Sequence, residues 1–152
     1  MPSVSDDRDN DYLQMFYHDL VEAAGNVFFV TDARGFFVYM NSAIETVMGF
    51  TPDYFFGKHY SEVVHPDWME RAVTFYTAQI LDMKPETTFE YEVLSSSGER
   101  RWVEQILRLI IVEGQIVGCN GLMHDISRRK HAEESRRNLE NNYVLVAENT
   151  GS

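Results

Sequence analysis

The sequence predicts an α+β domain with its helices grouped between two blocks of antiparallel strands. In this architecture one sheet face packs against the helices and encloses any cavity. Three observations support this class: residues 27–39 are typical of a hairpin, residues 42–83 carry helix signals, and residues 89–123 are typical of three strands. A chain of 152 residues fits one such core, and a second complete domain does not fit.

The chain before the first strand divides into two parts. Residues 1–9 are polar and acidic, so we expect them to be disordered. Residues 10–25 are expected to form a flanking helix, because Leu13, Phe16 and Leu20 recur at helical spacing. A glycine then ends this helix.

The first β block is a hairpin. Residues 27–30 and 36–39 are short runs of apolar and aromatic residues, and residues 32–35 between them supply turn chemistry. Two such runs joined by a short turn predict antiparallel pairing.

The middle of the chain is helical. Ser42 and Glu45 have the spacing of a capping box, and Gly49 stands where that helix would stop. Pro66 is expected in the first turn of the longest interior helix, which runs to about Met83.

The second β block is a three-stranded meander, followed by a charged helix. Strands are expected at residues 89–93, 101–112 and 115–123, with turn residues between them. We therefore place the folded core at residues 26–126 and a linker helix at residues 127–144.

Composition excludes several partners. The formal net charge of −11 disfavours binding to nucleic acid or to an anionic membrane surface. A single cysteine, Cys119, excludes an internal disulfide framework and a multi-cysteine metal site, so we expect a reducing, cytoplasmic location. No apolar run has the length of a membrane span, and no signal-peptide pattern is present.

The motifs between residues 20 and 134 resemble those of PAS domains. They occur in the expected order at residues 27–41 (VFFVTDARGFFVYMN), 49–52, 57–58, 64–67, 98, 101–102, 118, 121 and 125–130. The resemblance implies a five-stranded antiparallel sheet of order 2-1-5-4-3 with short helices on one face. It also implies a sensor or dimerisation module that signals through its exit helix to a histidine kinase or a cyclic-dinucleotide enzyme.

The end of the chain suggests a second unit of the same kind. Residues 145–151 echo residues 20–26, which precede the first predicted strand. Residues 145–152 are therefore expected to begin a following PAS unit, which makes the preceding helix an interdomain connector. The expected partners are a second copy of the chain and downstream signalling domains of the same chain.

Two cofactors common in this family are disfavoured. Tyr60 stands where the flavin photoreceptors of the family carry their reactive cysteine, and Met123 stands where they carry a glutamine. Haem-binding members take their iron ligand from the long interior helix, and residues 67–83 contain no histidine. We interpret His59 and His65 as capping or surface side chains. No metal or known cofactor is therefore expected, and an unknown small ligand is possible.

The polar candidates for a ligand pocket are spread over the predicted helices and strands. They are Asn41, Tyr54, Tyr60, Tyr76, Tyr91 and Gln105, together with Cys119 and Met123 on the last strand. The tyrosines have an alternative role, because an amphipathic ring can close a core with its hydroxyl at the rim. Cys119 is interpreted as a small core residue, since no basic neighbour in sequence would activate its thiol.

The junction between the last strand and the exit helix is the candidate for signal coupling. Asp125 is expected either to pair with Arg101 or to cap the helix that begins near Ser127.

Three functions are compatible with a domain of this class. The first is a sensor that binds a ligand and signals through its last helix, and the second is a ligand-free dimerisation and spacer domain. The third is a small isomerase-type enzyme, which requires a pair of buried acids or histidines in the cavity. The acids at Glu90 and Glu92 are predicted to point outward, and no catalytic motif is present, so we expect a non-catalytic regulatory domain.

Overall fold

The computed structural model describes residues 4–150. Its helices are α1 (Val4–Ala23), α2 (Ile44–Met48), α3 (Pro66–Leu81) and α4 (Ser127–Thr150), with two short 3₁₀ turns, η1 (Pro52–Tyr54) and η2 (Tyr60–Glu62). Its strands are β1 (Val27–Asp32), β2 (Phe37–Met40), β3 (Glu86–Leu94), β4 (Arg100–Val112) and β5 (Gln115–Asp125). Each predicted element is present in the predicted order.

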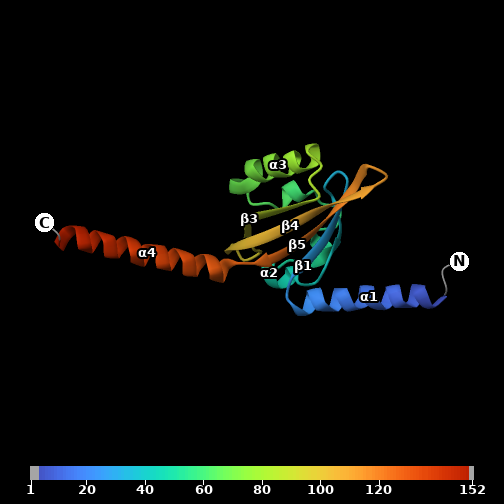
Figure 1. Ribbon diagram of the computed structural model, residues 1–152, viewed down its shortest axis with the longest axis horizontal. Helices are drawn as coiled ribbons and strands as arrows, with labels where there is room; N and C mark the ends of the chain where they lie inside the picture. Colours follow the sequence, from blue (N-terminus) through green and yellow to red (C-terminus); the bar gives the residue numbers. More distant parts are fainter. Residues whose placement is uncertain (1–3, 151–152) are drawn as a thin grey trace.

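The five strands form one antiparallel sheet of order β2-β1-β5-β4-β3, as predicted (Figure 1). The front hairpin joins the rear meander through β1 and β5, where Phe29 faces Gly121 in the register. The aromatic ring of Phe29 lies where a Cβ on Gly121 would be. The glycine therefore lets an aromatic side chain of the neighbouring strand cover β5.

Helix α2 begins differently from the prediction. Its N-cap is Ala43, which makes no side-chain capping hydrogen bond, and the Ser42 hydroxyl donates instead to the carboxylate of Glu22. The capping box lies at η2, where His59 and Glu62 bond to each other's backbone. The predicted capping box at residues 42–45 is therefore wrong, because Glu22, near the end of α1, accepts the hydrogen bond from the Ser42 hydroxyl.

Helix α3 is fixed at its C-terminal end by a buried glutamine. Gln79 donates to the carbonyl oxygens of Lys84 (3.2 Å) and Leu107 (3.1 Å) and accepts from the Thr87 hydroxyl (2.7 Å). These bonds connect the helix to β3 and β4 and use both ends of the amide. At its other end, α3 begins at Pro66, and His65 is its N-cap residue.

The terminal helices are longer than the sequence predicted. Helix α1 begins at Val4, so residues 4–9 are helical rather than disordered, and acidic residues are in fact favourable near a helix N-terminus. Helix α4 continues to Thr150, so residues 145–150 extend the linker helix beyond the predicted end at 144. Residues 1–3 and 151–152 lie outside the described part. The two helices extend in opposite directions from the sheet (Figure 1).

Candidate functional site

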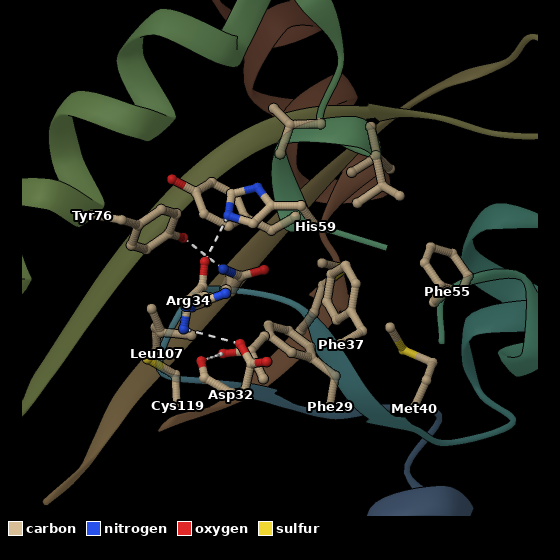
Figure 2. A pocket seen from close by; sticks show the side chains of 18 of the residues that line it. Phe29, Asp32, Arg34, Phe37, Met40, Phe55, His59, Tyr76, Leu107 and Cys119 are labelled. Carbon is tan, nitrogen blue, oxygen red and sulfur yellow. Dashed lines mark hydrogen bonds between the residues drawn. The ribbon is translucent and has the colours of Figure 1, made fainter. Parts of the chain in front are cut away.

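An apolar cavity of about 180 Å³ lies between the sheet and the helices that cover it (Figure 2). Strands β1 and β2, η2 and α3 all contribute to its walls. The apolar part of the lining includes Phe29, Phe37, Met40, Ile44, Phe55 and Leu107. Alternating strand residues and a layer of short helices therefore produce the enclosed space that the fold class predicted.

A buried polar triad, Tyr76–Gln105–Tyr91, lies in one wall of the cavity. The Tyr91 hydroxyl donates to Gln105 Oε1 (2.7 Å), and Gln105 Nε2 donates to the Tyr76 hydroxyl oxygen (2.6 Å). The three side chains come from β3, β4 and α3. Burial raises the pKa of Tyr76 and that of Tyr91 far above the ordinary phenol value, so both hydroxyls stay protonated.

All but two of the predicted pocket side chains line this cavity. Those that do are Tyr60, Tyr76, Tyr91, Gln105, Cys119 and Met123. The Cys119 thiol is buried, and its pKa is raised by that burial against the lowering effect of a hydrogen bond with Thr31. A thiol with a raised pKa is a weak nucleophile at neutral pH, which agrees with its interpretation as a core residue.

Asn41 is buried but does not line the cavity. Its Oδ1 accepts from the Phe28 backbone N–H and its Nδ2 donates to the Asn26 carbonyl, each at 3.0 Å. These two bonds tie the end of β2 to the start of β1. The predicted pocket role of Asn41 is wrong, because the backbone of the hairpin takes both ends of its amide.

Tyr54 also lies outside the cavity. Its ring stacks on Phe50 at a centroid distance of 4.1 Å, and the ammonium of Lys58 lies 3.2 Å from its ring centre. It is 39% exposed. The predicted pocket role of Tyr54 is therefore wrong as well, since a cation at the surface holds its ring outside.

The cavity lining includes polar residues that sequence reasoning missed. The turn at residues 32–35 lines it together with His59. His59 Nδ1 accepts from the Ser61 N–H (3.2 Å), so its Nε2 carries the proton and donates to the Arg34 carbonyl oxygen (2.7 Å). The Asp32 carboxylate accepts two backbone N–H groups of its own turn. Both side chains therefore hold the loops at this part of the cavity together.

Both histidines considered as iron ligands act as helix caps. His59 caps η2, and His65 Nδ1 accepts from the Asp67 N–H (3.0 Å) at the start of α3. This agrees with their interpretation as capping side chains. Within the described residues, no cluster of three acidic, histidine or cysteine side chains is arranged to hold a metal ion.

The junction of β5 and α4 has the capping arrangement and not the predicted ion pair. Asp125 Oδ1 accepts from the Ser127 N–H (2.7 Å), and the Ser127 hydroxyl accepts from the Trp102 N–H (2.9 Å). Arg101 instead donates to the carbonyl oxygens of Thr46 and Val47. The predicted pairing of Asp125 with Arg101 is wrong, because the unpaired carbonyls at the end of α2 take the guanidinium.

The next turn of α4 is also fixed to the sheet. Lys130 Nζ lies 2.7 Å from Glu90 Oε2 and 4.7 Å from the Trp102 ring centre, and the Arg129 guanidinium also contacts Glu90. The hydrogen bond from Lys130 is the largest cause of a lowered Glu90 pKa. The start of α4 is thus held to β3 and β4.

A chain of aromatic rings connects the cavity wall to this junction. Tyr76 contacts Phe89 (centroids 6.0 Å apart), Phe89 contacts Trp68 (6.0 Å), and Trp68 contacts Trp102 (5.5 Å). Trp102 then lies under Lys130 of α4. The triad and the exit helix are therefore in continuous side-chain contact.

The fold and the cavity define an α+β domain with a small apolar pocket, and comparison with known proteins identifies its family. The sequence pattern of the PAS fold matches residues 16–126. The chain therefore belongs to the PAS family, as its motifs indicated. A sensor associated with methyl sulfide methyltransferase in Methanosarcina acetivorans is 32% identical over 92 residues, or 57% of this chain. The match covers 9% of that relative's length.

Solved structures share the fold. A PAS domain from Colwellia psychrerythraea superposes with a TM-score of 0.67 at 22% identity, covering 76% of this chain and 98% of that one. A sensory box histidine kinase/response regulator from Burkholderia thailandensis gives 0.69 at 20% identity, covering 85% and 98%. The N-terminal domain of a diguanylate cyclase from Marinobacter aquaeolei gives 0.63 at 20% identity, covering 70% and 99%. These structures share the PAS fold with this chain.

Proposed function

We propose that this domain is a non-catalytic input module that binds a small ligand in its cavity and signals through α4 to an effector. The effector is a histidine kinase or a cyclic-dinucleotide enzyme on the same chain. One observation carries the proposal: the wall of the cavity is in continuous aromatic contact with the first turns of α4.

The size of the cavity supports a ligand. Protein interiors are close-packed, and an unfilled space of about 180 Å³ would cost stability that a filled core would not. A ligand-free spacer has no use for such a space. A bound molecule would recover the lost contacts and would change the packing of Tyr76, which lies at the start of the aromatic chain.

The contacts of α4 support an output role. Its start is fixed by hydrogen bonds from the Trp102 N–H to the Ser127 hydroxyl and from the Ile126 N–H to the Trp102 carbonyl oxygen, while the side chains of residues 134–143 are exposed. Within residues 4–150, no helix is apolar and long enough to cross a bilayer. The raised thiol pKa and burial of Cys119 suit the reducing cytoplasm, where we place the domain.

Helix α1 supports pairing with a second copy of this chain. It exposes large apolar side chains at 52–78% of their surface, namely Tyr12, Leu13, Met15, Phe16, Tyr17 and Leu20. At ~100° per residue these positions span more than a third of the helix circumference, which is wider than a two-helix seam. The net charge of −11 disfavours an anionic membrane, whereas a two-fold dimer lets identical apolar faces cover each other.

Native mass spectrometry of freshly purified protein, with an absorbance spectrum, tests ligand binding. We expect a protein species heavier than the chain by the mass of one small molecule. Cys119→Phe and Leu107→Phe each add a ring inside the cavity, and each should abolish the added mass. Val117→Leu, an exposed change on the same strand as Cys119, should retain it. A parent protein without added mass would favour the ligand-free spacer, and a mass retained in both cavity variants would place the molecule elsewhere.

A further inference from the structure

The hydrogen bonds of the polar triad leave one hydroxyl proton unused. The amide of Gln105 accepts from one tyrosine and donates to the other, so the tyrosine that accepts keeps its own O–H free. In the structure the tyrosine with the free O–H is Tyr76. If the side-chain amide of Gln105 were flipped by 180°, the tyrosine with the free O–H would be Tyr91. Among residues 4–150, the structure records no acceptor for the Tyr76 O–H. Buried donors are nearly always paired, so a free one in a cavity wall points to a ligand atom.

The cavity lining contains few acidic, basic or imidazole side chains. Among the lining residues of the described chain they are Asp32 and Arg34, from the turn at residues 32–35, and His59, the N-cap of η2. Asp32 is bonded within its turn, Arg34 is exposed, and His59 uses both ring nitrogens in hydrogen bonds. The triad offers no ion to balance a ligand charge. A charged group placed there would lose its hydration without compensation.

The volume limits the ligand to about one ring. An apolar cavity of ~150 Å³ holds one benzene molecule, and this cavity measures about 180 Å³. Phe29 and Phe37 meet edge to face (5.5 Å), and Phe37 and Phe55 do the same (5.9 Å), so aromatic surfaces line the side formed by β1 and β2. A planar ring with one short substituent, slightly larger than benzene, matches the volume of this cavity.

We infer that the ligand is an uncharged molecule of about one ring that carries one hydrogen-bond acceptor, a carbonyl or ether oxygen. The acceptor binds the free tyrosine hydroxyl of the Tyr76–Gln105–Tyr91 triad, and the ring lies against Phe29 and Phe37. This inference rests on the proposed ligand-binding function of the same cavity.

Three probes of nearly equal size test separately whether the ligand needs a hydrogen-bond acceptor and whether it must be uncharged. Acetophenone has a ring and a carbonyl, ethylbenzene lacks the acceptor, and benzoate carries a charge. In calorimetric titrations of the domain after exhaustive dialysis, we expect acetophenone to bind about tenfold more tightly than ethylbenzene, because one buried hydrogen bond is worth roughly that factor. Benzoate should give no measurable heat at the same concentrations.

A variant that removes every polar atom of the triad tests the assigned residues. In Tyr76→Phe/Gln105→Leu/Tyr91→Phe, donors and acceptors disappear together, so no orphaned polar group is left to destabilise the fold. We expect ethylbenzene to bind as before and the tenfold preference for acetophenone to vanish. Tyr54→Phe, at the exposed tyrosine outside the cavity, should keep the preference. The ratio of the acetophenone and ethylbenzene affinities is insensitive to small changes in the stability of a variant. The comparison of the three probes on the parent protein does not depend on any variant.

The possible failures are distinguishable. Equal or tighter binding of ethylbenzene, or tightest binding of benzoate, would overturn the inferred ligand class while leaving a ligand-binding cavity in place. Preference for acetophenone that survives in the triple variant would overturn the assignment to the triad. If no probe binds and no molecule is retained on purification, the proposed ligand-binding function fails together with the inference.

Discussion

The two terminal helices of this domain present opposite surfaces and are attached in different ways. Helix α1 exposes large apolar side chains between residues 12 and 20, whereas the exposed side chains of α4 over residues 127–143 are mainly charged and polar. The first turns of α4 are fixed to the sheet through Ser127 and Lys130. Exposed apolar side chains are stabilised when a partner covers them, while a polar helix fixed at one end is suited to carry a displacement outward. The difference supports the proposed roles, assembly for α1 and output for α4.

The largest effect is expected from charges placed on α1. Phe16→Glu/Leu20→Glu should weaken self-association at least a hundredfold, because burying each side chain is worth about 1.5–3 kcal/mol and a buried carboxylate adds a further cost. Light scattering over a concentration series measures it. Leu139→Glu makes the same change at a 70% exposed position of α4 and should leave association unchanged. Dissociation by the α4 variant alone would place the self-association surface on α4. A parent protein that is monomeric at high concentration would contradict self-association itself.

The attachment of α4 is expected to depend most on its aromatic contact. Trp102→Ala should lower the free energy of unfolding by about 2 kcal/mol, below the 3–5 of a fully buried tryptophan because this ring is half-buried. It should also remove any ligand response at α4. Urea denaturation gives the stability, and a spin label beyond the second turn of α4 reports the response. Tyr143→Ala, at a 77% exposed ring on α4, should change neither quantity. An unchanged ligand response in the tryptophan variant would show that the signal leaves by another route.

A smaller effect is expected from the Ser127 hydroxyl. Ser127→Ala removes the acceptor of the Trp102 N–H and should cost about 1 kcal/mol in denaturant titrations. Ser135→Ala, farther along α4, is the matched control and should have no cost. Equal effects of the two substitutions would mean that the bond at the junction contributes nothing specific.

The smallest effect concerns the ion pairs of Glu90. Because Lys130 lowers the pKa of this carboxyl, its contribution is complete above the ordinary glutamate pKa of about 4.3 and is lost as pH falls through the lowered folded value. Partial exposure limits the contribution to about 0.5 kcal/mol. Glu90→Gln should therefore be slightly destabilising at pH 7 and neutral near pH 2.5, as measured by urea titration at both values. A cost that persisted at low pH would indicate lost packing rather than lost charge.

The sequence predicted the features that local chemistry determines. The strands follow from apolar runs separated by turn residues, and Gly49 adopts the left-handed conformation that ends α2. The family motifs supplied the strand order, which periodicity alone does not give. Six pocket side chains lie on the cavity because strand alternation and helix phase place them there.

The errors arose where an outcome depends on distant neighbours. Tyr54 is an exception, because the cation over its ring belongs to Lys58, only four residues along the chain, whereas Tyr60 lines the cavity. Arg101 bonds to α2, which is far away in the chain, and Ser42 bonds to the end of α1. No local pattern specifies such partners. The boundaries of the terminal helices were missed because acidic or polar composition is compatible with both helix and disorder.

The attachment of Gln79 has a mechanical consequence for α3. Its buried amide holds the C-terminal end of the helix to the Leu107 backbone of β4 and to the turn at Lys84, whereas the other end contacts the sheet through an exposed Asp67–Arg100 ion pair and through the Trp68 ring. Trp68 lies on the same helix ~16 Å away, at 1.5 Å of rise per residue. We therefore expect a tilt imposed beside Tyr76 to displace Trp68 more than Gln79, and Trp68 contacts the tryptophan beneath α4.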